Sequence, residues 1–305
     1  MVATHDHSTA TRAIGASQTN VLNWTTEIPT RRLTKLVFVF TSTGVTALTM
    51  STVSKIVVKA NNLPIIDVTL DELRAYLYRF SKGGSVRPIS AITTNPATAT
   101  PLRRIAIPFT ILDAATKDLQ QTCQFPPDSS ISVEITMVTG ANQTGVAYLA
   151  YEQTDVEPLY YPKLIGYAAN CPASQTNFRA VFNEPEGIVE GFIIPTIGLS
   201  RVRLVLDGVQ VKHLLGQLTA SAADYDANSD SMLMEMEQDD VDWSSLIAGT
   251  AGQDGQINSP FCFDVHAMRP APQQNSFIEL ATNANWAGAS NRIAIYAVVP
   301  LKRGG

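Results

Sequence analysis

The densest set of possible metal ligands in the sequence is an acidic loop in its second half. Its oxygen-bearing side chains recur at alternate positions, and a glutamate stands at the twelfth: Asp224, Asp226, Asn228, Asp230 and Glu235. Oxygen ligands at this spacing are what a Ca²⁺ loop requires. The sixth position is Ser229, where such loops turn on glycine, and no flanking helix pair is predicted. Two interpretations stay open: a solvated acidic loop, or a Ca²⁺ site that clamps neighbouring subunits.

The residues that could carry out catalysis do not form a recognisable set. His5, His7, His213 and His266 have no serine or cysteine partner nearby in the sequence, and no Gly-x-Ser-x-Gly elbow is present. No glycine-rich phosphate loop occurs. The three cysteines have no paired spacing, which argues against a disulfide framework or a zinc site. We therefore expect no enzyme, with no catalytic, cofactor-binding or metal residues assigned.

Composition narrows the class of protein further. The chain has 305 residues, enough for two domains, and its charged fraction of 16% is below the usual value of about 25%. Much of the surface is therefore neutral, as in a protein that packs against copies of itself. The net charge of −5 argues against direct nucleic-acid binding. The most apolar run, at residues 36–40, is far shorter than the ~20 residues of a membrane span.

Two matched stretches organise the chain. Residues 53–64 lead into an apolar-striped segment at 70–80, and residues 199–208 lead into a similar segment at 211–218. Each is predicted to form a strand, a tight polar turn, a few extended residues and a short helix. Thr69 and Glu72 form a capping box for the first helix.

The repeat extends through the rest of both halves. Ser54 aligns with Ser200, Pro108 with Pro260, Glu134 with Glu279 and Tyr151 with Tyr296, at offsets of 145 to 152 residues. Apolar and polar residues alternate at 131–137, as in a half-buried strand. Residues 104–111 alternate too, but Pro108 within them predicts either an edge strand or a bulge. A repeat of this length indicates a duplicated domain.

The predicted fold is all-β, with two tandem eight-stranded jelly-roll sandwiches, each with a short inserted helix. We expect a flexible N-terminal arm at 1–20, a first jelly roll at 21–152 and a connecting segment at 153–185. A second jelly roll at 186–300 and a short tail at 301–305 follow.

This order of features resembles the double jelly-roll major capsid proteins. It is most similar to those of tail-less, icosahedral bacteriophages with an internal membrane, such as the Flavobacterium-infecting lipid phages. The run from Gly191 to Asp207-Gly208 and Leu214-Leu215 carries the resemblance in the second half. The resemblance implies a homotrimer that forms a pseudo-hexagonal capsomer and tiles a virion shell around a membrane.

The resemblance also implies a set of partners and a location. The partners would be other copies, minor capsid, penton or membrane proteins, and the lipid itself, with assembly in the host cytoplasm. The alternative is a tandem β-sandwich that binds carbohydrate or mediates adhesion. Trp24, Trp243 and Trp286 are few for the aromatic platform that sugar binding needs. A hydrolase on a β-scaffold is the third hypothesis, and it lacks a catalytic set.

Overall fold

The computed structural model describes much of the first half of the chain and mainly strands of the second half. Described are residues 4–25, 33–70, 72–73, 76, 102–109, 130–154, 160–168, 177–181, 188–194, 199–206, 208–215, 261–264, 277–282 and 292–300. The chain divides into two compact units. Unit 1 comprises Met1–Ile165 and Val298–Gly305, and unit 2 comprises Gly166–Ala297.

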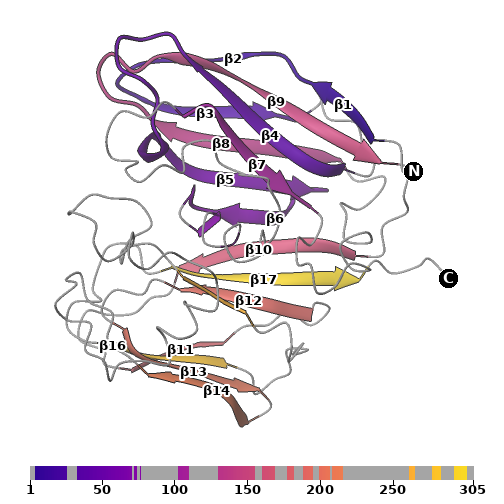
Figure 1. Ribbon diagram of the computed structural model, residues 1–305, viewed down its shortest axis with the longest axis vertical. Helices are drawn as coiled ribbons and strands as arrows, with labels where there is room; N and C mark the ends of the chain where they lie inside the picture. Colours follow the sequence, from indigo (N-terminus) through magenta and orange to yellow (C-terminus); the bar gives the residue numbers. More distant parts are fainter. Residues whose placement is uncertain are drawn as a thin grey trace. The chain divides into compact units, whose positions relative to one another are not determined.

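The strands of unit 1 form two layers (Figure 1). Their bounds are β1 (Thr4–Ser8), β2 (Arg12–Ile14), β3 (Thr19–Trp24), β4 (Leu33–Ser42), β5 (Val53–Ala60), β6 (Leu63–Val68), β7 (Arg104–Pro108), β8 (Ile131–Val138), β9 (Gly145–Thr154) and β10 (Tyr160–Ala168), the end of which belongs to unit 2, with a 3-10 turn η1 (Met50–Thr52) before β5. One layer has the order β1-β9-β4-β7, with β2 also on β9. The other has the order β6-β5-β8-β3, and β10 adds in parallel beside β6.

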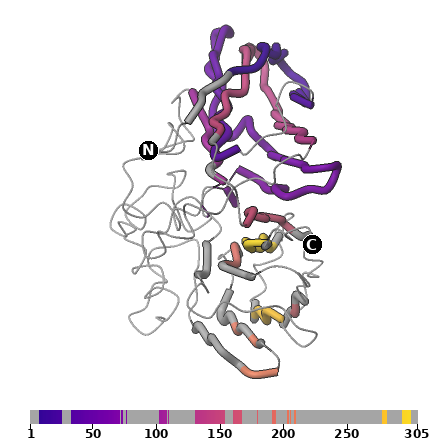
Figure 2. Tube along the Cα trace, turned by 90° about the vertical axis from the view of Figure 1, so that its right-hand side faces the viewer, coloured from indigo at the N-terminus to yellow at the C-terminus, as the bar shows by residue number. Residues whose placement is uncertain are grey.

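The core of unit 1 lies between these layers, which Figure 2 shows from the side. Along β8, buried and half-buried residues alternate, because one face of the strand packs on the core. Trp24 of β3 and Phe38 of β4 come from opposite layers, are both fully buried, and have ring centroids 5.9 Å apart. The alternation predicted at 131–137 is confirmed.

The described part of the first matched stretch folds as its sequence predicts. Asn61 and Asn62 have positive φ angles of 50° and 65°, which asparagine tolerates better than most residues, and they form the turn between β5 and β6. At the start of the predicted helix, Thr69 N donates to Glu72 Oε2 at 2.8 Å, and Glu72 N donates to Thr69 Oγ1 at 3.2 Å. The capping box is therefore confirmed; most of the helix after it lies outside the described residues.

The prediction for Pro108 is also confirmed. β7 stands at one end of its layer and pairs only with β4 among the described strands, with Pro108 opposite Lys35. A proline cannot donate a ladder hydrogen bond, so it is tolerated at the edge of a sheet.

The strands of unit 2 repeat the order found in unit 1. Their bounds are β11 (Asn177–Val181), β12 (Ile188–Ile194), β13 (Leu199–Leu206), β14 (Val209–Leu215), β15 (Phe261–Asp264), β16 (Phe277–Thr282) and β17 (Arg292–Pro300), the end of which belongs to unit 1. β11-β16-β13-β14 corresponds to β3-β8-β5-β6, and β15-β12-β17 corresponds to β7-β4-β9. The predicted duplication therefore holds at the level of strand order.

The two units also share two irregularities in their ladders. The pairing of β5 with β8 shifts between Val53 and Lys55, and that of β13 with β16 shifts between Leu199 and Arg201. These bulges centre on Ser54 and Ser200, the residues that the sequence alignment pairs. The second shift falls between residues 58 and 59 in unit 1 and between residues 204 and 205 in unit 2, again 146 residues apart.

The prediction of a second helix at 211–218 is wrong for its described part. Residues 211–215 belong to β14, which pairs with β13 in an antiparallel hairpin. Val211, Leu214 and Leu215 fit helical spacing, but a short apolar run fits both periods. The backbone hydrogen bonds offered by β13 after the turn at Gly208 decide in favour of the strand.

The predicted flexible arm and connecting segment also contain regular structure. Within residues 1–20, β1 and β2 pair with β9, and Ser17 N donates to Gly140 O at 3.1 Å. Within residues 153–185, β10 pairs with β6 and β11 pairs with β16. Residues 1–20 are small and polar and prolines interrupt residues 153–185, so neither segment has the periodicity that predicts a strand.

Candidate functional site

The acidic loop of the sequence analysis lies outside the described residues. This applies to all five of its ligands, Asp224, Asp226, Asn228, Asp230 and Glu235. Within the part of the chain that the structure describes, no group of three or more His, Cys, Asp or Glu side chains is placed to hold a metal ion. Ca²⁺ binding at the loop stays a prediction.

The histidines are not brought together by the described backbone. His5 and His7 lie in β1, opposite Gln153 and Tyr151 of β9. His213 lies in β14, opposite Arg203 of β13. His266 lies outside the described residues.

Trp24 is a core residue. Its side chain is fully buried, and its indole Nε1 donates to Ala10 O at 3.2 Å. It therefore does not belong to an exposed aromatic platform for sugars. Trp243 and Trp286 lie outside the described residues. For the same described residues, no helix has both the length and the apolar composition needed to cross a bilayer.

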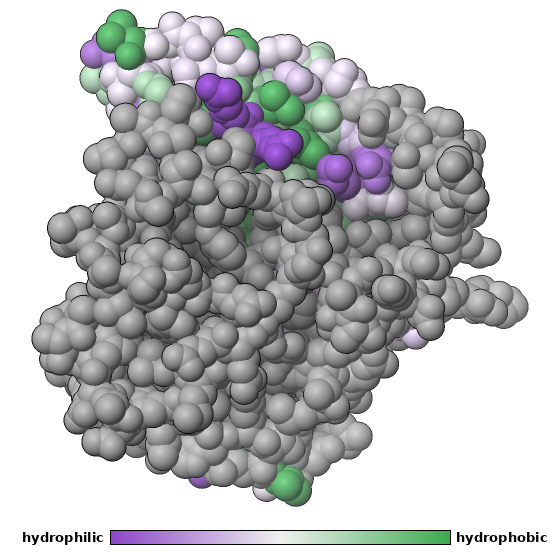
Figure 3. Space-filling model, in the orientation of Figure 1, coloured by the Kyte–Doolittle hydropathy of each residue, from purple (hydrophilic) through white to green (hydrophobic). Residues whose placement is uncertain are grey.

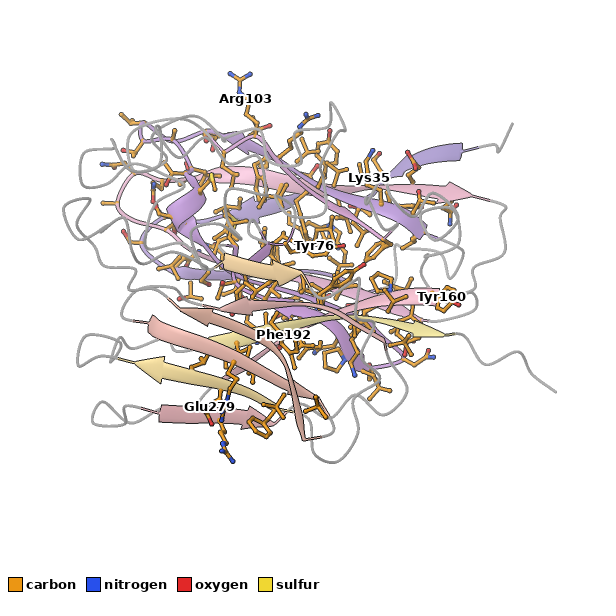
Figure 4. The ribbon with its side chains drawn as sticks, turned by 60° about the horizontal axis from the view of Figure 1, so that its bottom comes forward. Lys35, Tyr76, Arg103, Tyr160, Phe192 and Glu279 are labelled. Carbon is orange, nitrogen blue, oxygen red and sulfur yellow. The ribbon has the colours of Figure 1, made fainter. Side chains whose placement is uncertain are left out.

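The most developed side-chain cluster is a carboxylate between two arginines on the sheet of unit 2. Glu279 of β16 pairs in register with Arg179 of β11 on one side and Arg203 of β13 on the other. Arg179 Nε and Arg203 Nη2 each donate to the carboxylate at 2.9 Å. We call these three residues the Arg–Glu–Arg row; Figure 4 shows Glu279 within its strand.

The burial of the row increases toward its centre. The side chain of Glu279 is 8% exposed, that of Arg203 29% and that of Arg179 60%. The Arg179 guanidinium also lies over the ring of Phe277, with Cζ 4.5 Å from the ring centroid. A cation over an aromatic face is attracted by the ring's quadrupole. Arg179 is thus held in place even though most of its side chain faces solvent.

Electrostatics keep Glu279 ionised. Burial alone would raise its pKa, but the hydrogen bonds from Arg179 and Arg203 and their positive charges hold the pKa below its ordinary value. A carboxyl group in this state donates no proton near neutral pH. Its role is therefore to join β11, β16 and β13 by side-chain contacts in addition to their backbone ladders.

The sequence contained only part of the signal for this row. Glu279 was aligned with Glu134 as part of a strand, but its partners come from strands that lie 100 and 76 residues away along the chain. Only the register of three strands brings them together.

The equivalent row of unit 1 has different chemistry. Glu134 of β8 lies between Asn23 of β3 and Val57 of β5, in the same register that Glu279 has in unit 2. Asp67 of β6 lies opposite Val57 and forms an ion pair with Lys55, whose Nζ is 3.0 Å from Asp67 Oδ2. Glu134 is half-buried and has no arginine beside it in this row.

In both hairpins, the strand after the turn begins with an exposed apolar residue. Leu63 follows the turn between β5 and β6 and is 70% exposed; Val209 follows the turn between β13 and β14 and is 64% exposed. They are equivalent in the duplication, 146 residues apart. Elsewhere on the visible face of unit 1, hydrophobic and strongly hydrophilic residues lie next to each other (Figure 3). Single exposed apolar residues of this kind are common on protein surfaces and do not by themselves indicate a binding site.

Comparison with known proteins places the fold. No protein-family profile and no curated protein matches the sequence. Among solved structures, the major capsid protein P2 of bacteriophage PM2 matches with a TM-score of 0.61 and 11% identity, over 99% of this chain and 100% of that chain.

Two further structures match over nearly the whole chain. The Sulfolobus turreted icosahedral virus structure gives a TM-score of 0.55 at 13% identity, over 98% of this chain and 91% of that one. The PBCV-1 virus capsid gives 0.52 at 12% identity, over 98% and 94%. The chain therefore has the double jelly-roll fold of these capsid proteins, and the predicted fold class is confirmed.

Proposed function

We propose that this chain is the major coat subunit of an icosahedral virus particle. Three copies form a pseudo-hexagonal capsomer, and the capsomers tile a shell around an internal membrane. The observation that carries the proposal is the duplication: two units with the same strand order and the same bulges span the length of a viral coat protein.

Geometry explains why a duplicated chain suits this role. Three copies of a chain with two similar units present six similar sides, so a trimer can pack like a hexagon. Closed symmetry limits the growth of each capsomer, and repeated edges let capsomers meet in equivalent ways. A low charged fraction of 16% favours such close packing of copies.

The remaining partners follow from the same role. Minor capsid, penton and membrane proteins would contact the shell, and the lipid would lie inside it. The net charge of −5 disfavours direct contact with the genome. The location would be the virion, after assembly in the host cytoplasm. No enzymatic step belongs to this role.

The mass of the purified full chain in native mass spectrometry tests the proposal. We expect three times the 33.0 kDa mass of one chain, and a hexagonal outline in negative-stain electron micrographs. A monomer that binds glycans on an array would overturn the proposal and support the carbohydrate-binding alternative. Flotation of the trimer with phospholipid vesicles tests the membrane contact separately.

A further inference from the structure

One edge of unit 1 pairs with a further strand, whereas the equivalent edge of unit 2 pairs with none of the described strands. In unit 1, β10 lies beside β6 in parallel, with Leu164 opposite Ile66 and Ile165 opposite Asp67. The equivalent of β6 is β14, which ends the order β11-β16-β13-β14. Among the described residues, no strand pairs with the outer edge of β14.

An open edge of this kind accepts another strand readily. On one side, its backbone N–H and C=O groups have no ladder with any strand the structure describes, and an added strand would satisfy them with a regular ladder. The filled edge of β6 shows that the backbone at this position is compatible with a parallel neighbour.

The duplication identifies which strand is missing. β10 precedes β11 in the chain and neighbours β17, as β1 and β2 precede β3 and neighbour β9. The counterpart of β10 in unit 1 is therefore the β1–β2 segment. β1 ends its own layer, and no described strand pairs with its outer edge.

We propose that β1 of one copy adds in parallel to the open edge of β14 of a neighbouring copy. This rests on the proposed trimer. Each copy then donates one strand and accepts one, which is a head-to-tail contact that closes into a ring at three copies. The pairing within a chain, β10 on β6, would alternate with the pairing between chains, β1 on β14.

The register of the proposed β1–β14 pair follows from the observed register of the β10–β6 pair. Asn23 and Arg179 are equivalent because both lie opposite the aligned glutamates, and 179 − 23 = 156. Ile165 then corresponds to Thr9, since 165 − 156 = 9, and Asp67 corresponds to His213, since 67 + 146 = 213. Thr9 continues the β1 ladder, because its N donates to Leu149 O at 2.9 Å. We therefore place Thr9 opposite His213 of the neighbouring copy.

Disulfide trapping of the full-length trimer tests this register. The variant Thr9→Cys/His213→Cys is oxidised with copper–phenanthroline and run on a non-reducing gel. We expect covalent dimers and trimers that disappear with reductant, and little product from either single variant. Asp67→Cys/Ile165→Cys is the matched control, since it should form the equivalent bond within one chain and leave the mass unchanged.

Two further variants allow for a strand register that differs by one residue from the proposed one. Ser8→Cys and Ala10→Cys are each combined with His213→Cys. If the protein is a trimer by native mass spectrometry and none of the three pairs cross-links, the strand addition is wrong and the coat proposal stands. If the wild-type chain is a monomer, both are wrong.

Hydrogen exchange of the wild-type protein provides a test that needs no variant. In the trimer, the amides of β14 should exchange within about tenfold of those of β6, because both strands would then be paired on two sides. Exchange of β14 at least about a hundredfold faster than that of β6 would overturn the proposal.

Discussion

Equivalent rows of equivalent strands are built from different side chains in the two units. In unit 2, Glu279 is nearly enclosed by two arginines; in unit 1, Glu134 has an asparagine and a valine at the matching positions. The backbone register is identical, so the difference does not come from the fold. Strand order is set by the core face and the ladders, and the opposite face is free to acquire a separate function or source of stability.

The difference has an energetic consequence. A buried ion pair need not stabilise a protein more than apolar residues would, but removing one partner leaves the other charges uncompensated. Arg203 Nε is buried and has no hydrogen-bond partner among the described residues, so this arginine depends on its Nη contact with Glu279. Unit 2 should therefore be sensitive to substitution in this row, and unit 1 should not.

The largest expected effect is that of Glu279→Ala. It leaves the two arginines that flank position 279 without their carboxylate and should lower the free energy of unfolding by about 2–4 kcal/mol. Glu134→Ala, at the equivalent position, should change it by no more than about 0.5 kcal/mol. Urea denaturation of both variants measures the difference, and equal losses would show that the two rows are energetically alike.

Converting the row to apolar residues should recover much of that loss. We expect Glu279→Leu alone to be as destabilising as Glu279→Ala. Adding Arg203→Val, the residue type found at position 57, should bring the free energy of unfolding to within about 1 kcal/mol of wild type. The double-mutant cycle measures this coupling. Additive losses would mean that Arg203 does not depend on Glu279.

Acid should reduce the difference between wild type and Glu279→Gln. The folded-state pKa of Glu279 is lowered, so its stabilisation is present above the ordinary glutamate pKa of about 4.3 and is lost as pH falls through the folded value. Melting temperatures measured from neutral to acidic pH should differ most at neutral pH and draw progressively closer as the pH falls below the ordinary glutamate pKa. A difference that does not vary with pH would contradict the ionised role of Glu279.

The smallest expected effect distinguishes the two hairpin turns. Gly208 has a φ of 80° with nothing within 4 Å of an added Cβ, so Gly208→Ala should cost about 1 kcal/mol from backbone strain alone. Asn62→Gly should be neutral or stabilising by up to about 0.5 kcal/mol, because Asn-Gly suits this turn. Urea denaturation measures both, and a loss on Asn62→Gly would show that the asparagine side chain has a role of its own.

Much of the fold was predictable because its signals are local. The Asn61-Asn62 turn, the Thr69–Glu72 capping box and the edge position of Pro108 each depend on residues close in sequence. The duplication was predictable because the order of weak matches is informative when single matches are not.

The errors have a common physical cause. Residues 211–215 were predicted as helix because a short apolar run does not distinguish the two periods, and only pairing with β13 decides between them. β1 and β2 were predicted as a flexible arm because their stability comes from β9, more than 130 residues away. The Arg–Glu–Arg row was missed for the same reason, since it requires the register of three strands.

The shared bulges have a consequence for how such a chain diverges. An insertion within a strand would turn the side chains that follow it to the wrong face. The bulges at Ser54 and Ser200 lie at equivalent positions, so the number of strand residues between each bulge and its hairpin turn has not changed since the duplication. A difference in length follows the hairpins: residues 69–103 separate β6 from β7, whereas residues 216–260 separate β14 from β15. The two units therefore share a strand frame whose dimensions between bulge and hairpin are the same, whatever the lengths of the chain that follows each hairpin.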